Sequence, residues 1–387
     1  MKRTPLISPL VTGLAIVLAA TPAALAKSGN FLLIRRDMPV QTVEVAEIGA
    51  RRLVFREAGG SWVSVSRGRC VALLNTDVLI IPRRQGWLHL ADGQRLPGQA
   101  LSAARMTDVL VWIQSSWLGR MEVPLDHISS VLFESDATVP PQGDTDVLLL
   151  ANGDLVEGFI TSLSDPVSFE PTNADAAAID LPLGRVHAVR MVTPRQKPTG
   201  PRLWLIDGTV VEAQQVLLGD DGFYRLEGVP FTEEDSHRVA LDGVAAVLFD
   251  PDALVPFADL TPRRVEGPPT RYVVPAPRPL DDHAPLGLSP LEFSGPIKVH
   301  YVLPAGATYF AAEARLPALS RSWGDCELII RDDDRTVFMT RLNAETPAAT
   351  IGVRLSGSTL TVEVTEGAAG PIHDQVVLLR CLILVED

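Results

Sequence analysis

The sequence predicts an all-β protein in which tandem small β-barrel-like repeats precede a C-terminal antiparallel β-sandwich. A short stretch of similar sequence recurs with a period of 58 residues, and Asp-Gly or Asn-Gly turns separate short apolar runs. Both features are typical of tandem β units. Near the C-terminus, at least six runs of strand length follow one another without that period, which indicates a separate sandwich.

The N-terminus predicts export. Residues 1–26 contain Lys2 and Arg3, an apolar stretch, and a small-x-small triplet that ends at Ala26. This is the pattern of a secretory signal peptide cleaved after Ala26. A retained membrane anchor is the alternative, but the apolar run is short for a span. We expect the mature chain to have no membrane span and to be located in the periplasm, in the cell envelope or outside the cell.

Composition argues against nucleic acid as a partner. The formal net charge is −13, and removal of Lys2 and Arg3 brings it to −15. An acidic chain repels phosphate backbones. The apolar content of 46 % supports folded cores. The cysteines Cys70, Cys326 and Cys381 are odd in number. Cys326 and Cys381 form either a disulfide or two buried free thiols, and Cys70 falls on a core position of the first repeat.

The 58-residue period divides residues 27–250 into four repeats. The recurring stretches read "VSRGRCVALLNT", "VPLDHISSVLFE", "LPLGRVHAVRMV" and "VALDGVAAVLFD", and they begin at residues 65, 123, 181 and 239. We interpret each as the closing strand of a repeat, with core positions such as Val131 and Val247. The predicted bounds are 27–82 for a diverged repeat 1, 83–138 for repeat 2, 143–194 for repeat 3 and 200–250 for repeat 4.

Three repeats open with a hairpin signal. The stretches "WLHLADGQRLPG", "VLLLANGDLVEG" and "LWLIDGTVVEA" each place Asp-Gly or Asn-Gly between apolar runs, which predicts a two-residue turn with both residues at positive φ. Gly98 and Gly158 follow their turn glycines by five residues and predict a bulge or a sharp bend. Four or five short strands in about 58 residues favour a five-stranded barrel of SH3-like or Sm-like type.

Residues 251–282 are predicted to form a proline-rich connector and lead-in. Residues 251–290 hold ten of the 31 prolines, and without a repeated Pro-x-x-Pro pattern this composition favours an extended connector. Residues 283–387 follow with strand-like runs such as "IKVHYVLP", "CELIIRDDDRTVFMTRLN" and "TLTVEVTE". Turn signals separate them, and an antiparallel sandwich is the expected result.

This C-terminal region resembles the NPCBM/NEW2 family. The motifs that carry the resemblance are Asp259-Leu260-Thr261-Pro262, Gly287-Leu288, Tyr301-Val302-Leu303, Phe310-Ala311-Ala312 and the closing "GPIHDQVVLLRCLIL". The resemblance implies a galactose-binding-like jelly roll and a carbohydrate-binding function. It covers about the last third of the chain. Two departures stand out: Leu291 replaces the family histidine, and the closing pair is inverted to His373-Asp374. If the family histidine contacts sugar, this copy has kept the fold and lost that contact.

A sugar site needs an aromatic face to stack on the ring and polar groups to bond its hydroxyls. The candidate ligand-binding residues are Trp323 with Asp325 in "RSWGDCEL", and His373 with Asp374 in "GPIHDQV". Each has an alternative structural role. Trp323 could cover one end of the sandwich, and His373 and Asp374 could cap a loop. Loops at one end of a sandwich are where ligands gather, so we expect these two loops to meet.

Enzymatic function is not predicted. The chain has no Gly-x-Ser-x-Gly elbow, no His-Glu-x-x-His and no phosphate-binding glycine loop. Its seven histidines have no metal-ligand spacing, and "RDDDR" is interpreted as a hairpin tip rather than a calcium loop. We therefore expect no catalytic residues, no metal and no cofactor.

Two functional hypotheses follow. The first is an exported carbohydrate-binding protein whose partner is a glycan or polysaccharide and whose sandwich is carried on the repeats. The second is a cell-envelope scaffold whose partner is an envelope protein and whose jelly roll has lost sugar binding. An exposed Trp323 beside His373 and Asp374 would favour the first hypothesis. A continuous apolar patch across several repeats would favour the second.

Overall fold

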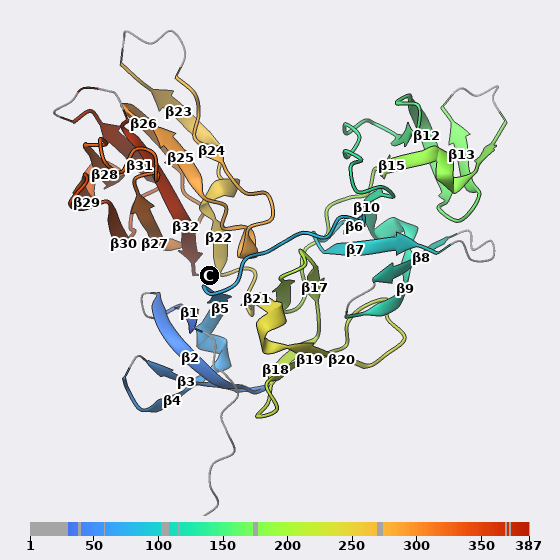
Figure 1. Cartoon of the computed structure of the whole chain (residues 1–387), viewed down its shortest axis with the longest axis horizontal. Coiled ribbons are helices and arrows are strands. Elements are labelled where there is room, and N and C mark those ends of the chain that lie inside the picture. Colours follow the sequence, from blue (N-terminus) through green and yellow to red (C-terminus); the bar gives the residue numbers. More distant parts are fainter. Residues whose placement is uncertain are drawn as a thin grey trace, which may run out of the picture.

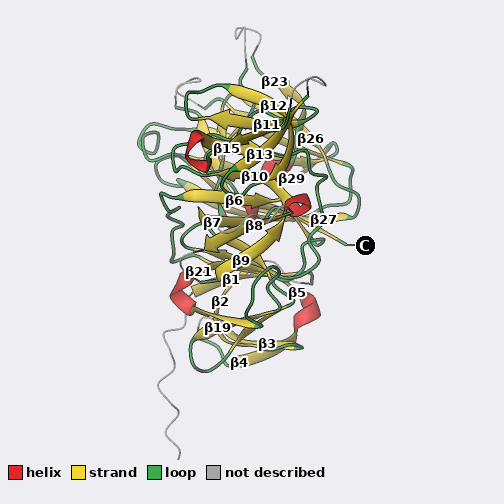
Figure 2. Ribbon diagram, turned by 90° about the vertical axis from the view of Figure 1, so that its right-hand side faces the viewer, coloured by secondary structure: helices red, strands yellow, loops and turns green. Residues whose placement is uncertain are grey.

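The computed structural model describes residues 30–386 except 38–39, 58, 102–107, 115–116, 173–176, 269–273, 368–369 and 371–372. These residues form strands joined by loops and short 3-10 turns (Figure 2). The strands belong to one large antiparallel network, built from residues 30–248, and two smaller antiparallel sheets, built from residues 254–385. The predicted signal peptide lies outside the described residues. Within the described part, no helix is long and apolar enough to cross a membrane.

The large network contains the four repeats. Repeat 1 comprises β1 (Asn30–Arg35), β2 (Gln41–Ile48), β3 (Arg52–Glu57), β4 (Trp62–Ser66) and β5 (Cys70–Asn75). Repeat 2 comprises β6 (Gly86–Leu90), β7 (Arg95–Ala100), β8 (Val109–Gln114), β9 (Gly119–Pro124) and β10 (Ile128–Leu132). Repeat 3 comprises β11 (Asp146–Leu150), β12 (Leu155–Ser162), β13 (Val167–Pro171), β14 (Ile179–Leu181) and β15 (Val186–Arg190). Repeat 4 comprises β16 (Arg202–Leu205), β17 (Val210–Glu212), β18 (Gln215–Leu218), β19 (Phe223–Glu227), β20 (Ser236–Ala240) and β21 (Val244–Leu248).

Each repeat follows the same path. In repeat 3, for example, β11 pairs with β12, β12 with β13, β13 with β14, and the closing strand β15 returns to β11. A short 3-10 turn precedes the closing strand in all four repeats. The predicted closed barrel does not form, because no ladder joins the fourth strand to the closing strand among the described residues. The second edge of the closing strand pairs with another repeat instead.

The closing strands join the repeats in two pairs. β5 of repeat 1 pairs with β21 of repeat 4, and β10 of repeat 2 pairs with β15 of repeat 3. In the first pair Leu73 lies opposite Val247, and in the second Val131 lies opposite Val189. These four residues occupy equivalent positions of the 58-residue period. Each pair therefore has the self-complementary geometry of a two-fold symmetric dimer, although both members belong to one chain.

The opening hairpins differ from the predicted turn. Only the glycines have positive φ, 91° at Gly93, 89° at Gly153 and 90° at Gly208. The preceding Asp or Asn instead accepts a hydrogen bond from the backbone two residues on, as Asp92 Oδ1 does from Gln94 N at 2.9 Å. This is a three-residue loop, a type I turn followed by a left-handed glycine. Asp and Asn favour it because their side chains bond the local backbone.

At Gly98 and Gly158, where the sequence predicts a bulge or a sharp bend, the structure shows close contact with a neighbouring strand. A Cβ at Gly98 would lie 2.3 Å from the Ile113 carbonyl oxygen, and one at Gly158 would lie 2.2 Å from that of Glu170. Neither position shows a register shift, so each glycine allows close approach of a neighbouring strand. In repeat 4 the equivalent residue is Ala213, and there the ladder is interrupted between β17 and β18.

The repeats share one continuous hydrophobic core. Its buried residues come from all four repeats and include Leu73, Val131, Val189 and Val247. The "FTEEDSH" segment of repeat 4, residues 231–237, contacts repeat 2: Glu122 N donates to the Phe231 carbonyl at 2.9 Å. The four repeats therefore pack into one body and are not separate domains joined by linkers.

Two facing sheets form the C-terminal sandwich. One sheet contains β22 (Leu254–Pro256), β24 (Arg278–Pro279), β25 (Leu291–Ser294), β27 (Ala307–Arg315), β30 (Ala348–Arg354) and β32 (Gln375–Val385). The other contains β23 (Pro262–Glu266), β26 (Ile297–Val302), β28 (Cys326–Asp332), β29 (Arg335–Leu342) and β31 (Thr359–Thr365). Because β22 and β23 pair with β32 and β26, the sandwich includes part of the predicted connector and begins before residue 283.

The sandwich packs directly on the pair formed by repeats 1 and 4. A buried apolar cluster joins Ala72, Leu74, Ala246 and Leu248 of that pair to Leu382 and other residues of the sandwich. Figure 1 shows the sandwich above these two repeats, with repeats 2 and 3 on the other arm of the molecule. The three cysteines are buried and free, so Cys326 and Cys381 are thiols in this structure.

Candidate functional site

Trp323 lies in the loop between β27 and β28 at one end of the sandwich. Its side chain is 73 % exposed, which is unusual for an aromatic residue of this size. The loop around it is ordered by backbone hydrogen bonds: Ser320 N donates to the Pro317 carbonyl, and Trp323 N and Gly324 N both donate to the Ser320 carbonyl. The indole is therefore presented to solvent on a short, bonded turn. It does not cover the end of the sandwich.

The two predicted loops meet at Gly324. A Cβ added to Gly324 would lie 3.0 Å from the His373 carbonyl oxygen, so this glycine lets the "GPIHDQV" backbone approach the "RSWGDCEL" turn. Ser320 strengthens the junction, because its Oγ donates to Gln375 Oε1 at 3.2 Å and its side chain is buried. The structure thus brings the two segments together at one end of the sandwich.

Asp325 is occupied by an ion pair that the sequence did not predict. Both of its carboxylate oxygens accept hydrogen bonds from Arg341, from Nε and from Nη2, each at 2.6 Å. These bonds and the carboxylate charge raise the pKa of Arg341. Asp325 therefore holds Arg341 in place, and the exposed guanidinium is the group left to meet a ligand. A planar guanidinium with a bidentate partner keeps further N–H groups available as donors.

His373 and Asp374 occupy different environments. His373 is exposed and has a φ of 66°, a left-handed conformation that turns the chain at the loop end. Asp374 is 2 % exposed, and neither carboxylate oxygen has a hydrogen-bond partner of normal geometry among the described residues. Burial raises the pKa of Asp374, and the amides of Gly367 and Asp325 only partly oppose that shift. Asp374 is thus a buried carboxylate beneath the loops and not a surface contact.

The arrangement can stack and hydrogen-bond a polar ring. Trp323 supplies an apolar face, Arg341 supplies N–H donors, and His373 lies on the adjoining loop. Of the predicted residues, Trp323 and His373 are accessible to a ligand. Asp325 instead bonds Arg341, and Asp374 is buried beneath the loops. Arg341 was missed because its proximity to Asp325 depends on the β28–β29 register, which shifts at a bulge between Ile330 and Arg331.

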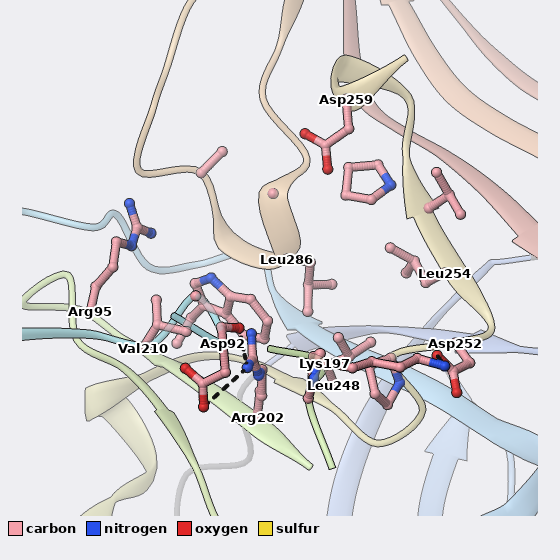
Figure 3. Close-up of a pocket in the computed structure, with 18 of the residues that line it drawn as sticks. Asp92, Arg95, Lys197, Arg202, Val210, Leu248, Asp252, Leu254, Asp259 and Leu286 are labelled. Atoms are coloured by element: carbon pink, nitrogen blue, oxygen red, sulfur yellow. Dashed lines mark hydrogen bonds and ion pairs between the residues drawn. The ribbon is translucent and has the colours of Figure 1, made fainter. Parts of the chain in front are cut away.

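A larger cleft lies between the repeats and the sandwich (Figure 3). Its volume is about 690 Å³. Its floor consists of buried residues of the apolar cluster that joins the sandwich to repeats 1 and 4: Trp204, Val210, Leu248, Leu254 and Leu286. The volume of the cleft and its place between two domains are typical of ligand sites.

Two of the cations that line this cleft are paired with carboxylates. Arg202 pairs with Glu212 at 3.3 Å, and Lys197 pairs with Asp252 at 2.8 Å. Arg95 donates to the Asp282 carbonyl at 3.0 Å and so links repeat 2 to the sandwich. Burial raises the pKa of Asp259, and the positive charge of Arg195 opposes that shift. Several of the polar groups that line the cleft are therefore engaged within the molecule, and the Arg95 bond to Asp282 crosses from the repeats to the C-terminal region.

Comparison with known proteins finds only distant likeness. No family model matches the chain. No curated protein matches it either. The NPCBM/NEW2 resemblance thus has no support from a family model.

Among solved structures, the chain is similar to carbohydrate-binding modules. The CBM51 of Clostridium perfringens GH95, solved in complex with methyl-galactose, is 12 % identical, with 34 % of this chain and 99 % of that chain covered at a TM-score of 0.28. The tandem CBM22 domains of Paenibacillus barcinonensis Xyn10C are 12 % identical, with 94 % of this chain and 100 % of that chain covered at a TM-score of 0.22. For the M60 catalytic domain with two CBM51 domains from Clostridium perfringens ZmpB, identity is 12 %, coverage is 89 % of this chain and 31 % of that chain, and the TM-score is 0.30. Similarity of this degree assigns neither a ligand nor an activity to this chain.

Proposed function

We propose that the protein is an exported, non-catalytic carbohydrate-binding protein whose binding surface is the loop end of the sandwich around Trp323. The observation that carries the proposal is the 73 % exposure of Trp323 on a hydrogen-bonded turn. An exposed aromatic face offers a large, rigid contact surface at low entropic cost. The resemblance of the sequence to NPCBM/NEW2 gives the same class of ligand.

Arg341 supplies the polar half of the site. Asp325 holds its guanidinium by two hydrogen bonds, so the donors are oriented before a ligand arrives, and preorganisation of this kind favours affinity. His373 adds a polar ring on the neighbouring loop. Asp374 supports the loops from inside and is expected to influence binding only through their position.

The test is glycan binding by the full mature chain, residues 27–387. A labelled sample is first screened on a glycan array, and the affinity for the best glycan is then measured by titration. Trp323→Ala is expected to weaken binding at least about tenfold, because it removes the main contact surface. Arg341→Gln is expected to weaken it less.

Leu319→Ala is the matched control. Leu319 lies in the same loop and is 92 % exposed, but it offers no aromatic face, so its removal should leave the affinity unchanged. Each variant should keep the unfolding temperature of the wild type. If Trp323→Ala binds as tightly as the wild type, the site lies elsewhere. If the wild type binds no glycan, the cell-envelope scaffold hypothesis replaces the proposal.

A further inference from the structure

The opening hairpins of repeats 2 and 4 contact each other at their tips. The tip comprises residues 91–95 in repeat 2, 151–155 in repeat 3 and 206–210 in repeat 4. In repeats 2 and 4 the two tips cover one another: Val210 at the start of β17 lies opposite Arg95 at the start of β7 in an antiparallel pairing. Counted from the turn glycines, Arg95 and Val210 are the same position.

Side chains add hydrogen bonds to this contact from both repeats, although these bonds do not join equivalent positions. The tip of repeat 2 reaches repeat 4, because Gln94 Oε1 accepts a hydrogen bond from Glu212 N at 2.9 Å. The tip of repeat 4 reaches repeat 2, because Asp207 Oδ2 accepts one from Trp117 Nε1 at 3.1 Å. Like the two closing-strand ladders, the backbone pairing of the two tips joins equivalent positions of two repeats. Every one of these three pairings is therefore self-complementary.

The tip of repeat 3 has no such cover. All five residues 151–155 are exposed, and a Cβ added to Gly153 would meet nothing within 4 Å. At the equivalent Gly208 an added Cβ would lie 2.7 Å from the Trp87 ring. Figure 1 shows β12 and β13 at the extremity of the molecule, on the arm that lies away from the sandwich.

This uncovered hairpin also exposes large apolar residues. Leu155 is 52 % exposed and Phe159 is 56 % exposed. The position of Leu155 is held by Arg95 in repeat 2, and the position of Phe159 is held there by Gln99 and in repeat 4 by Gln214. In repeat 4 the position of Leu155 is held by Val210, which is buried in the contact with repeat 2. Repeat 3 thus exposes to solvent an apolar residue that repeat 4 buries in a contact, and it carries Phe159 where repeats 2 and 4 carry glutamine. Exposed apolar residues at a repeated contact position indicate a binding surface.

We propose that the opening hairpin of repeat 3 binds the same hairpin of a second copy of the chain, in an antiparallel pairing centred on Leu155. A second copy is the occupant that the molecule favours, because the two closing-strand ladders and the pairing of Arg95 with Val210 each join a position to its own equivalent. A two-fold homodimer does the same by symmetry. Small apolar contacts of this kind form weak, concentration-dependent dimers.

Cysteine cross-linking tests the geometry. In an antiparallel pairing centred on Leu155, the two Leu155 residues face each other across the two-fold axis at a Cα separation that suits a disulfide. Leu155→Cys should therefore give a covalent dimer of the full chain under mild oxidation, while the three native cysteines are buried and free. Thr161→Cys is the control: it lies on the same exposed face of β12 but off the axis, and should remain monomeric. Equal cross-linking of the two variants would overturn the proposal.

Sedimentation equilibrium tests the association without chemistry. The wild type should pass from monomer to dimer as its concentration rises. The double variant Leu155→Arg with Phe159→Gln carries the residues of repeat 2 and should weaken the association roughly tenfold or more. Met339→Gln, which removes an equally exposed apolar residue of the sandwich, should leave the association unchanged. A wild type that stays monomeric at all concentrations, or a double variant that associates like the wild type, would overturn the proposal. Glycan binding is measured separately, so either proposal can fail alone.

Discussion

The pair of repeats 1 and 4 and the pair of repeats 2 and 3 have the same ladder and register but different outer faces. In the first pair, four residues beside the two-fold axis of the ladder point away from the core of the repeats, and the sandwich covers them. They are Ala72, Leu74, Ala246 and Leu248. In the second pair the same positions of the period are Ser130, Leu132, Ala188 and Arg190. There the cover comes from the connecting segment with Ala137 and Val139.

The difference shows how one repeated scaffold can direct two kinds of packing. The pairing of the closing strands does not depend on the residues of the outer face, because side chains alternate between the two faces of a strand. Serine in place of alanine and arginine in place of leucine are enough to remove a fully apolar surface. The location of the sandwich is thus encoded by a few outward residues and not by the ladder that presents them.

The largest effect is expected when the first pair is given the outer face of the second. Leu248→Arg places at repeat 4 the residue that repeat 3 carries at Arg190. Leu248 is 7 % exposed under the sandwich, so the substitution buries a charge and should lower the free energy of unfolding by roughly 3 kcal/mol or more. Calorimetry should show the sandwich and the repeats unfolding in separate transitions.

The reverse exchange is the control. Arg190→Leu changes a half-buried residue at the rim of the second pair and should alter stability by no more than about 0.5 kcal/mol. If both exchanges have equal effects, the outer face does not determine where the sandwich packs.

A smaller effect is a loss of stability at acidic pH that originates in the second pair, at His89. Burial, together with the nearby charged forms of Arg95, His283 and Arg190, lowers the pKa of His89 from 6.5 to about 4. His89 is therefore neutral in the folded protein while the unfolded chain takes up a proton. Stability from this residue is complete above pH 6.5 and is lost as the pH falls toward 4. At pH 5 the loss is about 2 kcal/mol.

Comparison with His89→Leu isolates this contribution. Repeat 3 has Leu149 at the same position and repeat 4 has Trp204, neither of which titrates. Denaturant unfolding at pH 7.5 and pH 5 should show a smaller acid loss for the variant than for the wild type. Equal losses would assign the acid sensitivity instead to carboxylates whose pKa is lowered in the folded protein, such as Asp333, which accepts hydrogen bonds from Thr359 and Ser358.

Local patterns predicted the repeats well and their pairing not at all. The period, the Asp-Gly turns and the closing strands could be predicted because they depend on neighbours in sequence. The partner of each closing strand could not, since β5, β10, β15 and β21 present similar apolar edges. The open repeats follow from the same fact: an edge that pairs with another repeat cannot close its own barrel.

The site shows the same division. The exposure of Trp323 and the meeting of its loop with the His373 segment follow from turn residues at the ends of strands, and could be anticipated. The burial of Asp374 and the engagement of Asp325 by Arg341 depend on strand register and on what lies beneath the loops. A carboxylate in a sequence carries no sign of whether it will be paired, buried or free.

The smallest effect concerns the turn of repeat 3, compared with its equivalent in repeat 4. Asn152 is exposed, and its Oδ1 accepts one hydrogen bond, from Asp154 N at 3.2 Å. Asn152→Ala should therefore lower the free energy of unfolding by about 0.5 kcal/mol in the monomer. Asp207 is 5 % exposed and accepts bonds from Trp117 Nε1 and from the buried Thr209 N, so Asp207→Ala leaves a buried donor unpaired and should cost about 2 kcal/mol. Chemical denaturation at low protein concentration measures both. Equal costs would mean that the tip of repeat 3 is already covered, which would contradict the exposed hairpin on which the homodimer rests.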